Sequence, residues 1–172
     1  CLRELSLDEK KYKPNQVLSV ISRAKDDLLD AGSYTIHALA QNDPYRNMVA
    51  TIYSLYQKKL VKANALDFGD LILRSTMALR DQEALREKYQ ARFRFVMVDE
   101  YQDTNHAQYL LTKHLVAPPK NLCVVGDDDQ SVYSWRGADI RNIMEFERDY
   151  PGATVVKLEQ NYRSTEPILE AA

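Results

Sequence analysis

Two short apolar runs that each end abruptly in acidic residues place the strongest constraint on how this chain folds. Phe95–Val98 is followed by Asp99 and Glu100, and Leu122–Gly126 is followed by three aspartates and Gln130. A Val-rich run of this length, bounded by polar residues, predicts a strand that is buried on both faces of a sheet. Because ligands of open α/β sheets bind beyond the carboxyl ends of such strands, the acids predict a metal–nucleotide site.

The residue types at these strand ends suit phosphoryl chemistry. Mg²⁺ takes oxygen ligands, usually one or two carboxylates with waters and substrate phosphates, and this role suits Asp99. Glu100 is placed to orient or deprotonate an attacking water. The amide of Gln130 can contact a γ-phosphate or that water. The opposing interpretation is that an Asp-Glu pair after a strand forms only a solvated turn.

Three longer motifs surround these residues. Val98–Asn105 resembles the Walker B segment of the UvrD/PcrA/Rep group of superfamily 1 DNA helicases. Val125–Asp139 is similar to the third helicase motif of that group, and Leu158–Ser164 is similar to its fourth. Leu66–Leu71 also resembles PcrA-type proteins, and a weaker likeness toward the amino terminus extends the resemblance over nearly the whole chain.

The resemblance implies a fold class and a division of the chain. It implies an α/β fold in which part of a RecA-like P-loop NTPase parallel sheet (subdomain 1A) carries an all-helical inserted subdomain (1B). Residues 1–92 correspond to helical subdomain 1B, 93–150 to the carboxyl-terminal part of motor domain 1A, and 151–172 to the start of motor domain 2A. In this group, 1B helps to contact duplex DNA and ATP binds between the motor domains.

The resemblance also implies roles for residues that say little on their own. Tyr162 is expected to stack on adenine, and Arg163 to sense closure around ATP and stabilise charge on the transferring phosphoryl group. Tyr133 and Trp135 are expected to face single-stranded DNA, since exposed aromatics stack on bases without sequence preference. Arg136 would add a phosphate or cation–π contact. As isolated residues, both aromatics would instead be interpreted as core.

The first half of the chain is predicted to be mainly helical. Pro14 starts a helix, and Gly32 is expected to cap its carboxyl end. Asn42–Pro44 opens a second helix. A third helix is predicted to begin near Asp67, and a fourth follows with Asp81 as its amino-terminal cap.

The second half is predicted to return to α/β structure. Thr104 is expected to cap a helix that Pro118–Pro119 stops. Asp139–Asp149 is a further predicted helix, and Ala153–Leu158 is a candidate for a third strand. Cys123 lies inside an apolar run, so we expect it to be a small core residue.

Composition limits the class of protein. Hydrophobic residues make up 45% of the 172 residues and charged residues 28%, as is usual for soluble globular proteins. A net charge of -2 gives no global signature of nucleic-acid binding, although it leaves room for a local DNA channel. The two cysteines suggest no disulfide framework. The absence of a transmembrane run or signal peptide from the sequence favours a cytoplasmic protein.

One motif needed for ATP hydrolysis is missing from these 172 residues. A P-loop ends in Gly-Lys-Ser/Thr, and none of the five glycines is followed by lysine. In the helicase group this loop precedes subdomain 1B. We therefore expect the chain to be a segment of a longer protein and to be inactive alone.

Three functions remain under consideration. The resemblance implies an ATP-dependent 3′–5′ DNA helicase or translocase that uses ATP and Mg²⁺ on single-stranded and duplex-junction DNA, in repair or replication and with protein partners from those processes. The alternative is a non-catalytic nucleotide- or DNA-binding module derived from a helicase. The joint presence of Asp99, Glu100, Gln130 and the Tyr162–Arg163 pair argues against this binding module. A metal-dependent nuclease would also use clustered carboxylates, but it would explain neither Gln130 nor that pair.

Overall fold

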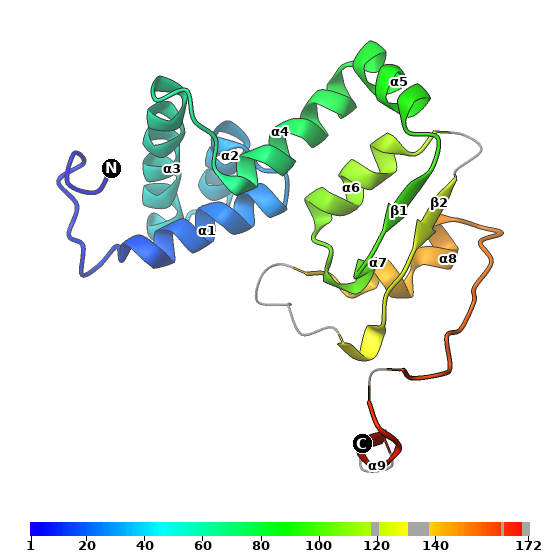
Figure 1. Ribbon diagram of the computed structural model, residues 1–172. Coiled ribbons are helices and arrows are strands. Elements are labelled where there is room, and N and C mark those ends of the chain that lie inside the picture. The colour runs from blue at the N-terminus through cyan, green and yellow to red at the C-terminus, as the bar shows by residue number, and fades with distance from the viewer. Residues whose placement is uncertain (118–120, 131–137, 163, 170–172) are drawn as a thin grey trace.

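The computed structural model describes residues 1–117, 121–130, 138–162 and 164–169 (Figure 1). Five helices come first: α1 (Pro14–Asp26), α2 (Ala31–Gln41), α3 (Pro44–Lys62), α4 (Phe68–Asp81) and α5 (Glu83–Arg92). The elements that follow are β1 (Val96–Val98), the 3₁₀ turn η1 (Tyr101–Asp103), α6 (His106–Leu115), β2 (Leu122–Val124), the 3₁₀ turn η2 (Asp128–Gln130), α7 (Arg141–Met144), α8 (Phe146–Asp149) and α9 (Glu166–Leu169). Among the described residues, no helix is long and apolar enough to span a bilayer.

Two predicted helix starts are confirmed, and both depend on an aspartate. The Asp43 carboxylate accepts hydrogen bonds from the N–H groups of Tyr45 and Arg46 at the start of α3. Asp67 Oδ1 accepts a hydrogen bond of 2.8 Å from the N–H of Asp70 in α4. These side chains satisfy backbone donors that have no partner within the helix, so the starts could be predicted from local sequence.

The predicted role of Gly32 is wrong. The first helix ends at Asp26, and Leu28 then takes a left-handed backbone conformation with φ of 57°. Asp30 accepts a hydrogen bond of 2.7 Å from the N–H of Ser33, which starts α2. Gly32 therefore lies in the first turn of α2, a helix that was not predicted from the sequence.

Two other predicted caps are wrong by one residue. Asp81 is the last residue of α4 and pairs with Arg80, whereas α5 starts after Gln82 without a side-chain cap. Thr104 donates its hydroxyl hydrogen bond to a carbonyl of η1, and Asn105 caps α6 in a reciprocal capping box. In both places a neighbouring polar residue has the backbone geometry that the cap needs.

The main apolar core lies among the first three helices. It consists of Tyr12, Val17, Ile21, Ala24, Tyr34, Ala38, Val49, Ala50, Ile52 and Tyr53. The apolar residues recur at helical spacing, so the inward faces of α1, α2 and α3 meet in one cluster.

A buried ionic cluster joins this core to α4. Lys25 on α1 is 1% exposed, and its Nζ lies 2.7 Å from Asp67 Oδ2 and 3.0 Å from Asp70 Oδ1. Tyr56 donates a hydrogen bond to Asp67, and Gln57 donates one to Asp70. A buried cation is tolerated only when it is paired, and here two carboxylates pair with it.

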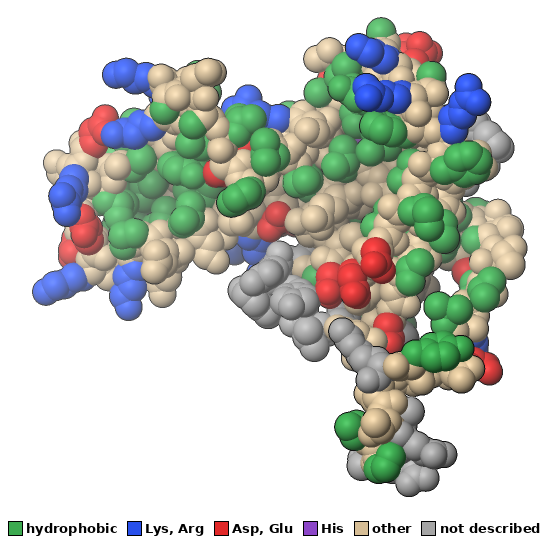
Figure 2. All heavy atoms as spheres, in the orientation of Figure 1, with side chains coloured by type: hydrophobic (Ala, Val, Ile, Leu, Met, Phe, Trp, Pro, Cys, Tyr) green, Lys and Arg blue, Asp and Glu red, His purple; other side chains and the backbone are tan. Residues whose placement is uncertain are grey.

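The predicted parallel pairing of the two strands is confirmed, with Met97 opposite Cys123. The prediction that both faces are buried is wrong, because Phe95 and Met97 are 76% and 75% exposed and Cys123 is exposed as well. Cys123 is therefore not a core residue in this chain. Figure 2 shows hydrophobic side chains over the strands. The described helices cover only one face of the sheet, whereas a parallel strand needs cover on both.

The carboxyl-terminal elements are less regular than predicted. The predicted helix at 139–149 is divided at Glu145 into α7 and α8. The predicted strand at 153–158 does not form in the described structure: this stretch is exposed and pairs with neither β1 nor β2. A strand is stable only with a hydrogen-bonded neighbour, which an apolar pattern alone does not supply.

A hydrogen bond between side chains joins α1 to α6. Asn105 Nδ2 donates a hydrogen bond of 2.7 Å to Asp26 Oδ1. Burial, together with the neighbouring charge of Asp27, raises the pKa of Asp26 to about 6, against a smaller opposing effect of Arg23. The ordinary value of an unfolded aspartate is about 3.9.

This raised pKa predicts a pH dependence of stability. The folded chain binds the Asp26 proton more tightly than the unfolded chain, so the stabilisation is full below about pH 4 and is lost as pH rises through about 6. Asp26→Asn keeps an acceptor for Asn105 and should remove this component, raising stability at pH 7 by about 1–2 kcal/mol. Urea unfolding between pH 4 and 7.5 measures the free energy of unfolding of both proteins as a function of pH. Identical pH slopes for the variant and the unmodified chain would contradict the prediction.

Candidate nucleotide site

Backbone hydrogen bonds hold the carboxyl ends of the two strands together. The N–H of Val125 donates to the carbonyl of Val98 at 2.8 Å, and the N–H of Tyr101 donates to the carbonyl of Val125 at 2.9 Å. The residues that follow each strand therefore lie at one edge of the sheet, as the sequence predicted. Figure 2 shows acidic side chains grouped at this end of the strands.

Asp99 and Glu100 are exposed directly after β1. The backbone of Glu100 is left-handed, with φ of 50° and ψ of 44°. This conformation costs a residue other than glycine about 1–2 kcal/mol. Asp99 Oδ1 accepts a hydrogen bond of 2.9 Å from the N–H of Glu100. A strained backbone at a strand end, held by the surrounding structure, is often found at functional sites.

A chain of hydrogen bonds connects the end of β1 to η2. Gln102 Nε2 donates to Glu100 Oε2 at 2.7 Å, and Gln102 Oε1 accepts from the N–H of Asp127 at 3.1 Å. Gln130 Nε2 donates to Asp127 Oδ2 at 2.6 Å. The structure therefore brings the predicted residues Glu100 and Gln130 into one connected group. Gln102 was not predicted as a site residue, and Asp127 was considered only as one of the clustered carboxylates of a nuclease. The part that both residues take here depends on contacts across the sheet.

A glycine leaves room for this connection. An ideal Cβ built on Gly126 would lie 2.6 Å from Gln102 Oε1 and 2.8 Å from the Cδ1 of Ile143. Both distances are shorter than real Cβ contacts allow. A side chain at position 126 would therefore displace the Gln102 amide or the neighbouring helix α7.

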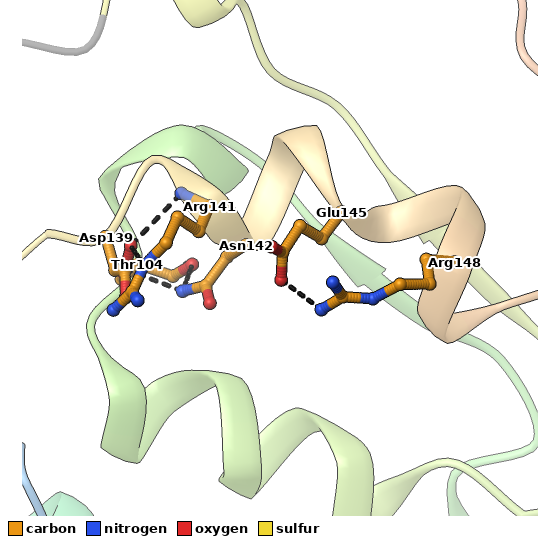
Figure 3. Close-up of polar contacts among 6 residues, drawn as sticks. All are labelled: Thr104, Asp139, Arg141, Asn142, Glu145 and Arg148. Carbon is orange, nitrogen blue, oxygen red and sulfur yellow. Dashed lines mark hydrogen bonds and ion pairs between the residues drawn. The ribbon is translucent and has the colours of Figure 1, made fainter.

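A second set of contacts joins the residues after η1 to α7 (Figure 3). The carbonyl of Thr104 accepts hydrogen bonds of 3.0 Å from the N–H of Asp139 and from Asn142 Nδ2. Asn142 Nδ2 also lies 3.1 Å from the Thr104 hydroxyl. Arg141 pairs with Asp139 on the exposed side. The contacts between Thr104 and Asn142 join residues 38 positions apart along the chain, and no local sequence pattern indicates them.

One further predicted site residue that the structure describes, Tyr162, does not join this group. Tyr162 is 86% exposed, and its hydroxyl donates to Gln160 Oε1 at 3.0 Å. The remaining predictions concern residues outside those that the structure describes. They are Tyr133, Trp135, Arg136 and Arg163.

The donor chemistry at the strand ends fits a magnesium ion that arrives with a nucleotide. Among the described residues, no group of three or more histidine, cysteine or acidic side chains is placed to hold a metal. Asp99 is nevertheless an exposed carboxylate, and magnesium commonly takes one or two carboxylates with phosphates and waters completing its shell. The arrangement offers one such ligand, the two further carboxylates of Glu100 and Asp127, and the amides of Gln102 and Gln130.

Comparison with known proteins supports a helicase relationship. The family described as "UvrD/REP helicase N-terminal domain" matches residues 2–151 of this chain. The match includes both strands and the connected group from Glu100 to Gln130.

Individual relatives match nearly the whole chain. It is 51% identical to the ATP-dependent DNA helicase PcrA of Bacillus subtilis (strain 168) over 172 residues, and 48% identical to the ATP-dependent DNA helicase UvrD1 of Mycobacterium leprae (strain TN) over 180 residues. It is 48% identical to the ATP-dependent DNA helicase PcrA of Staphylococcus aureus (strain Mu50 / ATCC 700699) over 171 residues. Each alignment covers 99% of this chain and 23% of the relative. The chain thus spans about a quarter of the length of these relatives.

Proposed function

Because this chain belongs to the UvrD/REP helicase N-terminal domain family, we propose that it is a segment of an ATP-dependent DNA helicase that moves 3′ to 5′ along single-stranded DNA. The observation that carries the proposal is the group at one edge of the sheet. Glu100 after β1 and Gln130 after β2 are joined through hydrogen bonds, and Asp99 lies exposed beside them. Carboxylates and an amide at adjacent strand ends suit phosphoryl transfer to water.

The division into subdomains is part of the proposal. Residues 1–92 would form the helical subdomain 1B, 93–150 part of motor domain 1A, and 151–172 the start of motor domain 2A. In support, α1, α2 and α3 share one core and a buried ionic cluster joins α4 to it, whereas both strands come later, after α5. The uncovered face of the sheet fits a motor domain that other segments complete.

Each residue at the strand ends has a proposed task. Asp99 would hold the Mg²⁺ of Mg–ATP, which neutralises charge on the phosphates. Glu100 would accept a proton from the attacking water as general base. Gln130 would contact the γ-phosphate or orient that water. Hydrogen bonds to Glu100 and Gln130 restrict their motion and thereby favour a fixed geometry for the attack.

The remaining assignments extend the proposal to adenine and DNA. Tyr162 would stack on adenine, and Arg163 would stabilise charge on the transferring phosphoryl group. Tyr133 and Trp135 would stack on the bases of single-stranded DNA, with Arg136 at a phosphate or a ring. The high exposure of Tyr162 leaves its ring available for stacking. We also propose a cytoplasmic location and partners among repair or replication proteins.

A second candidate function is a nucleotide- or DNA-binding module without hydrolysis. The absence of a Gly-Lys pair from these 172 residues favours it for the isolated chain. The position of Glu100 argues against it for the longer protein. A general base held by a buried amide has no evident purpose in a module that only binds.

The experiment compares the isolated chain with the full-length protein that carries it. We expect the 172-residue chain to hydrolyse ATP at the background rate, because it has no loop to bind the phosphates. The full-length protein should hydrolyse ATP with a rate that rises on addition of single-stranded DNA, measured by phosphate release.

Two outcomes would contradict the proposal. Hydrolysis by the isolated chain above background would show that the P-loop is not required. A full-length protein that binds DNA but does not hydrolyse ATP would support the binding module instead. A strand-displacement assay on duplexes with 3′ or 5′ overhangs tests the proposed direction.

A further inference from the structure

The residue that connects the two strand ends is a buried glutamine. Gln102 is 1% exposed and lies in η1, between Glu100 and α6. Both ends of its amide are used: Nε2 donates to the Glu100 carboxylate at 2.7 Å, and Oε1 accepts from the N–H of Asp127 at 3.1 Å. A buried amide that satisfies both partners restricts their relative position.

The orientation of this amide follows from its partners. A reversed amide would place Oε1 against the Glu100 carboxylate and an N–H group against the N–H of Asp127. Both contacts would be repulsive, so only the observed orientation is compatible with the two neighbours. The Gln102 amide therefore requires a hydrogen-bond acceptor after β1, the Glu100 carboxylate, and a hydrogen-bond donor after β2, the N–H of Asp127.

The hydrogen bond from Gln102 also restricts the side chain of Glu100, which is otherwise free to move. Glu100 has a left-handed backbone, and its carboxylate is exposed. An exposed glutamate side chain usually samples several rotamers, and one hydrogen bond to a buried, fixed donor reduces that freedom. The Asp127 end of the same amide continues to Gln130, whose Nε2 donates to Asp127 Oδ2 at 2.6 Å.

We infer that Gln102 is a positioning residue for ATP hydrolysis, which holds the Glu100 carboxylate and the Asp127–Gln130 turn at a fixed separation. This inference rests on the proposed function, because it gives Gln102 a task only if Glu100 activates water. Gln102 itself contacts neither the nucleotide nor the reacting atoms in this proposal. Its effect is on the geometry of two groups that do.

The test uses Gln102→Glu in the full-length protein. The new carboxylate keeps an acceptor for the N–H of Asp127 but cannot donate to Glu100, and its charge repels the Glu100 carboxylate. We expect kcat for DNA-stimulated ATP hydrolysis to fall at least 10-fold. KM for ATP and the stoichiometry of fluorescent-nucleotide binding should remain within twofold, because binding groups are left in place.

Two further variants separate positioning from stability. Gly126→Ala leaves Gln102 unchanged but brings a methyl group to about 2.6 Å from its Oε1, so it should lower kcat in the same way. Gln90→Glu is the matched control. Gln90 on α5 donates to the carbonyl of His114 at 2.8 Å, so the same chemical change occurs away from the strand ends. It should reduce the melting temperature without changing kcat.

A readout independent of turnover uses the 172-residue chain. The ¹³C chemical shifts of Glu100 report whether its backbone remains left-handed, and exchange of the Asp127 amide proton reports whether its acceptor is present. We expect Gln102→Met to change both and Gln90→Glu to change neither. If Gln102→Met leaves both unchanged, the amide does not hold these groups and the inference is overturned.

The kinetic outcomes are also distinct. If the unmodified full-length protein shows no DNA-stimulated hydrolysis, the proposed function fails and the role of Gln102 in hydrolysis fails with it. If the unmodified protein is active and Gln102→Glu retains its kcat, only the inference about Gln102 is overturned. Equal losses of kcat in Gln102→Glu and Gln90→Glu would also overturn it, because they would indicate a general effect on stability.

Discussion

Replacing Lys25 with methionine is expected to lower the free energy of unfolding of this chain by about 3–5 kcal/mol. The Lys25 ammonium is 1% exposed and lies within 3.0 Å of two carboxylates, and Asp70 is fully buried. Methionine fills a similar volume but leaves both carboxylates without this cation. Arg74 Nε, at 3.7 Å from Asp70 Oδ1, is a more distant cation than Lys25 Nζ at 3.0 Å. A buried carboxylate that loses its closest cation either stays charged at high cost or binds a proton.

The pKa of Asp67 shows that Lys25 stabilises the charged form of this carboxylate partner. Burial alone would raise the pKa of Asp67, but hydrogen bonds from Lys25, the Asp70 N–H and Tyr56 together hold this pKa below its usual value. A lowered folded-state pKa contributes stability that is present above the unfolded pKa near 4 and is lost as pH falls below it. In Lys25→Met the free energy of unfolding should therefore decrease less as the pH falls below about 4 than it does in the unmodified chain.

Urea unfolding followed by circular dichroism measures the loss, with Lys58→Met as the matched control. Lys58 is exposed on α3, so the same substitution there should change the free energy of unfolding by less than about 0.5 kcal/mol. Adding Asp70→Leu to Lys25→Met removes the carboxylate that is buried most deeply and should recover part of the stability. A loss of under 1 kcal/mol in Lys25→Met would mean that the buried cluster contributes little.

The second large effect is expected at Glu100. Glu100→Gln in the full-length protein should lower DNA-stimulated ATP hydrolysis by about 100-fold or more, in keeping with the usual contribution of a general base. The amide oxygen of the new side chain can still accept the hydrogen bond from Gln102. The geometry is thus kept while the ability to take a proton is lost.

Phosphate release measures this loss, and equilibrium binding of a fluorescent nucleotide shows whether the site is intact. Glu147→Gln is the control, since Glu147 is an exposed glutamate on α8 that undergoes the same change. We expect normal hydrolysis in the control and normal nucleotide binding in both variants. Hydrolysis that is indifferent to Glu100→Gln would withdraw the assignment of Glu100 as general base.

The features that could be predicted from the sequence depend on neighbours along the chain. Asp43 and Asp67 cap helices through their own backbone surroundings, so their residue types and positions were sufficient. The convergence of Glu100 and Gln130 was also predictable, because parallel strands place their carboxyl ends at one edge. Both predictions used rules that hold whatever the rest of the fold is.

The failures depend on contacts that the sequence does not display. Cys123 lies in an apolar run that predicts burial, yet burial requires a second layer that the described part of this chain does not provide. Val155 and Val156 have the pattern of a strand but no paired neighbour. Gln102 was missed because its two partners belong to different strand ends, and the spacing between them along the chain carries no periodic signal.

Asp67 has a consequence for how this sequence can change over evolutionary time. Its carboxylate starts α4 through Oδ1 and pairs with the Lys25 ammonium through Oδ2, so one side chain serves two separate structural needs. An asparagine at position 67 could still cap α4, but it could not form an ion pair with Lys25. A lineage therefore cannot exchange Lys25, Asp67 or Asp70 one at a time without passing through a less stable intermediate. Among related sequences, these three positions should therefore change together or stay unchanged, whereas the exposed lysines of α3 should change independently.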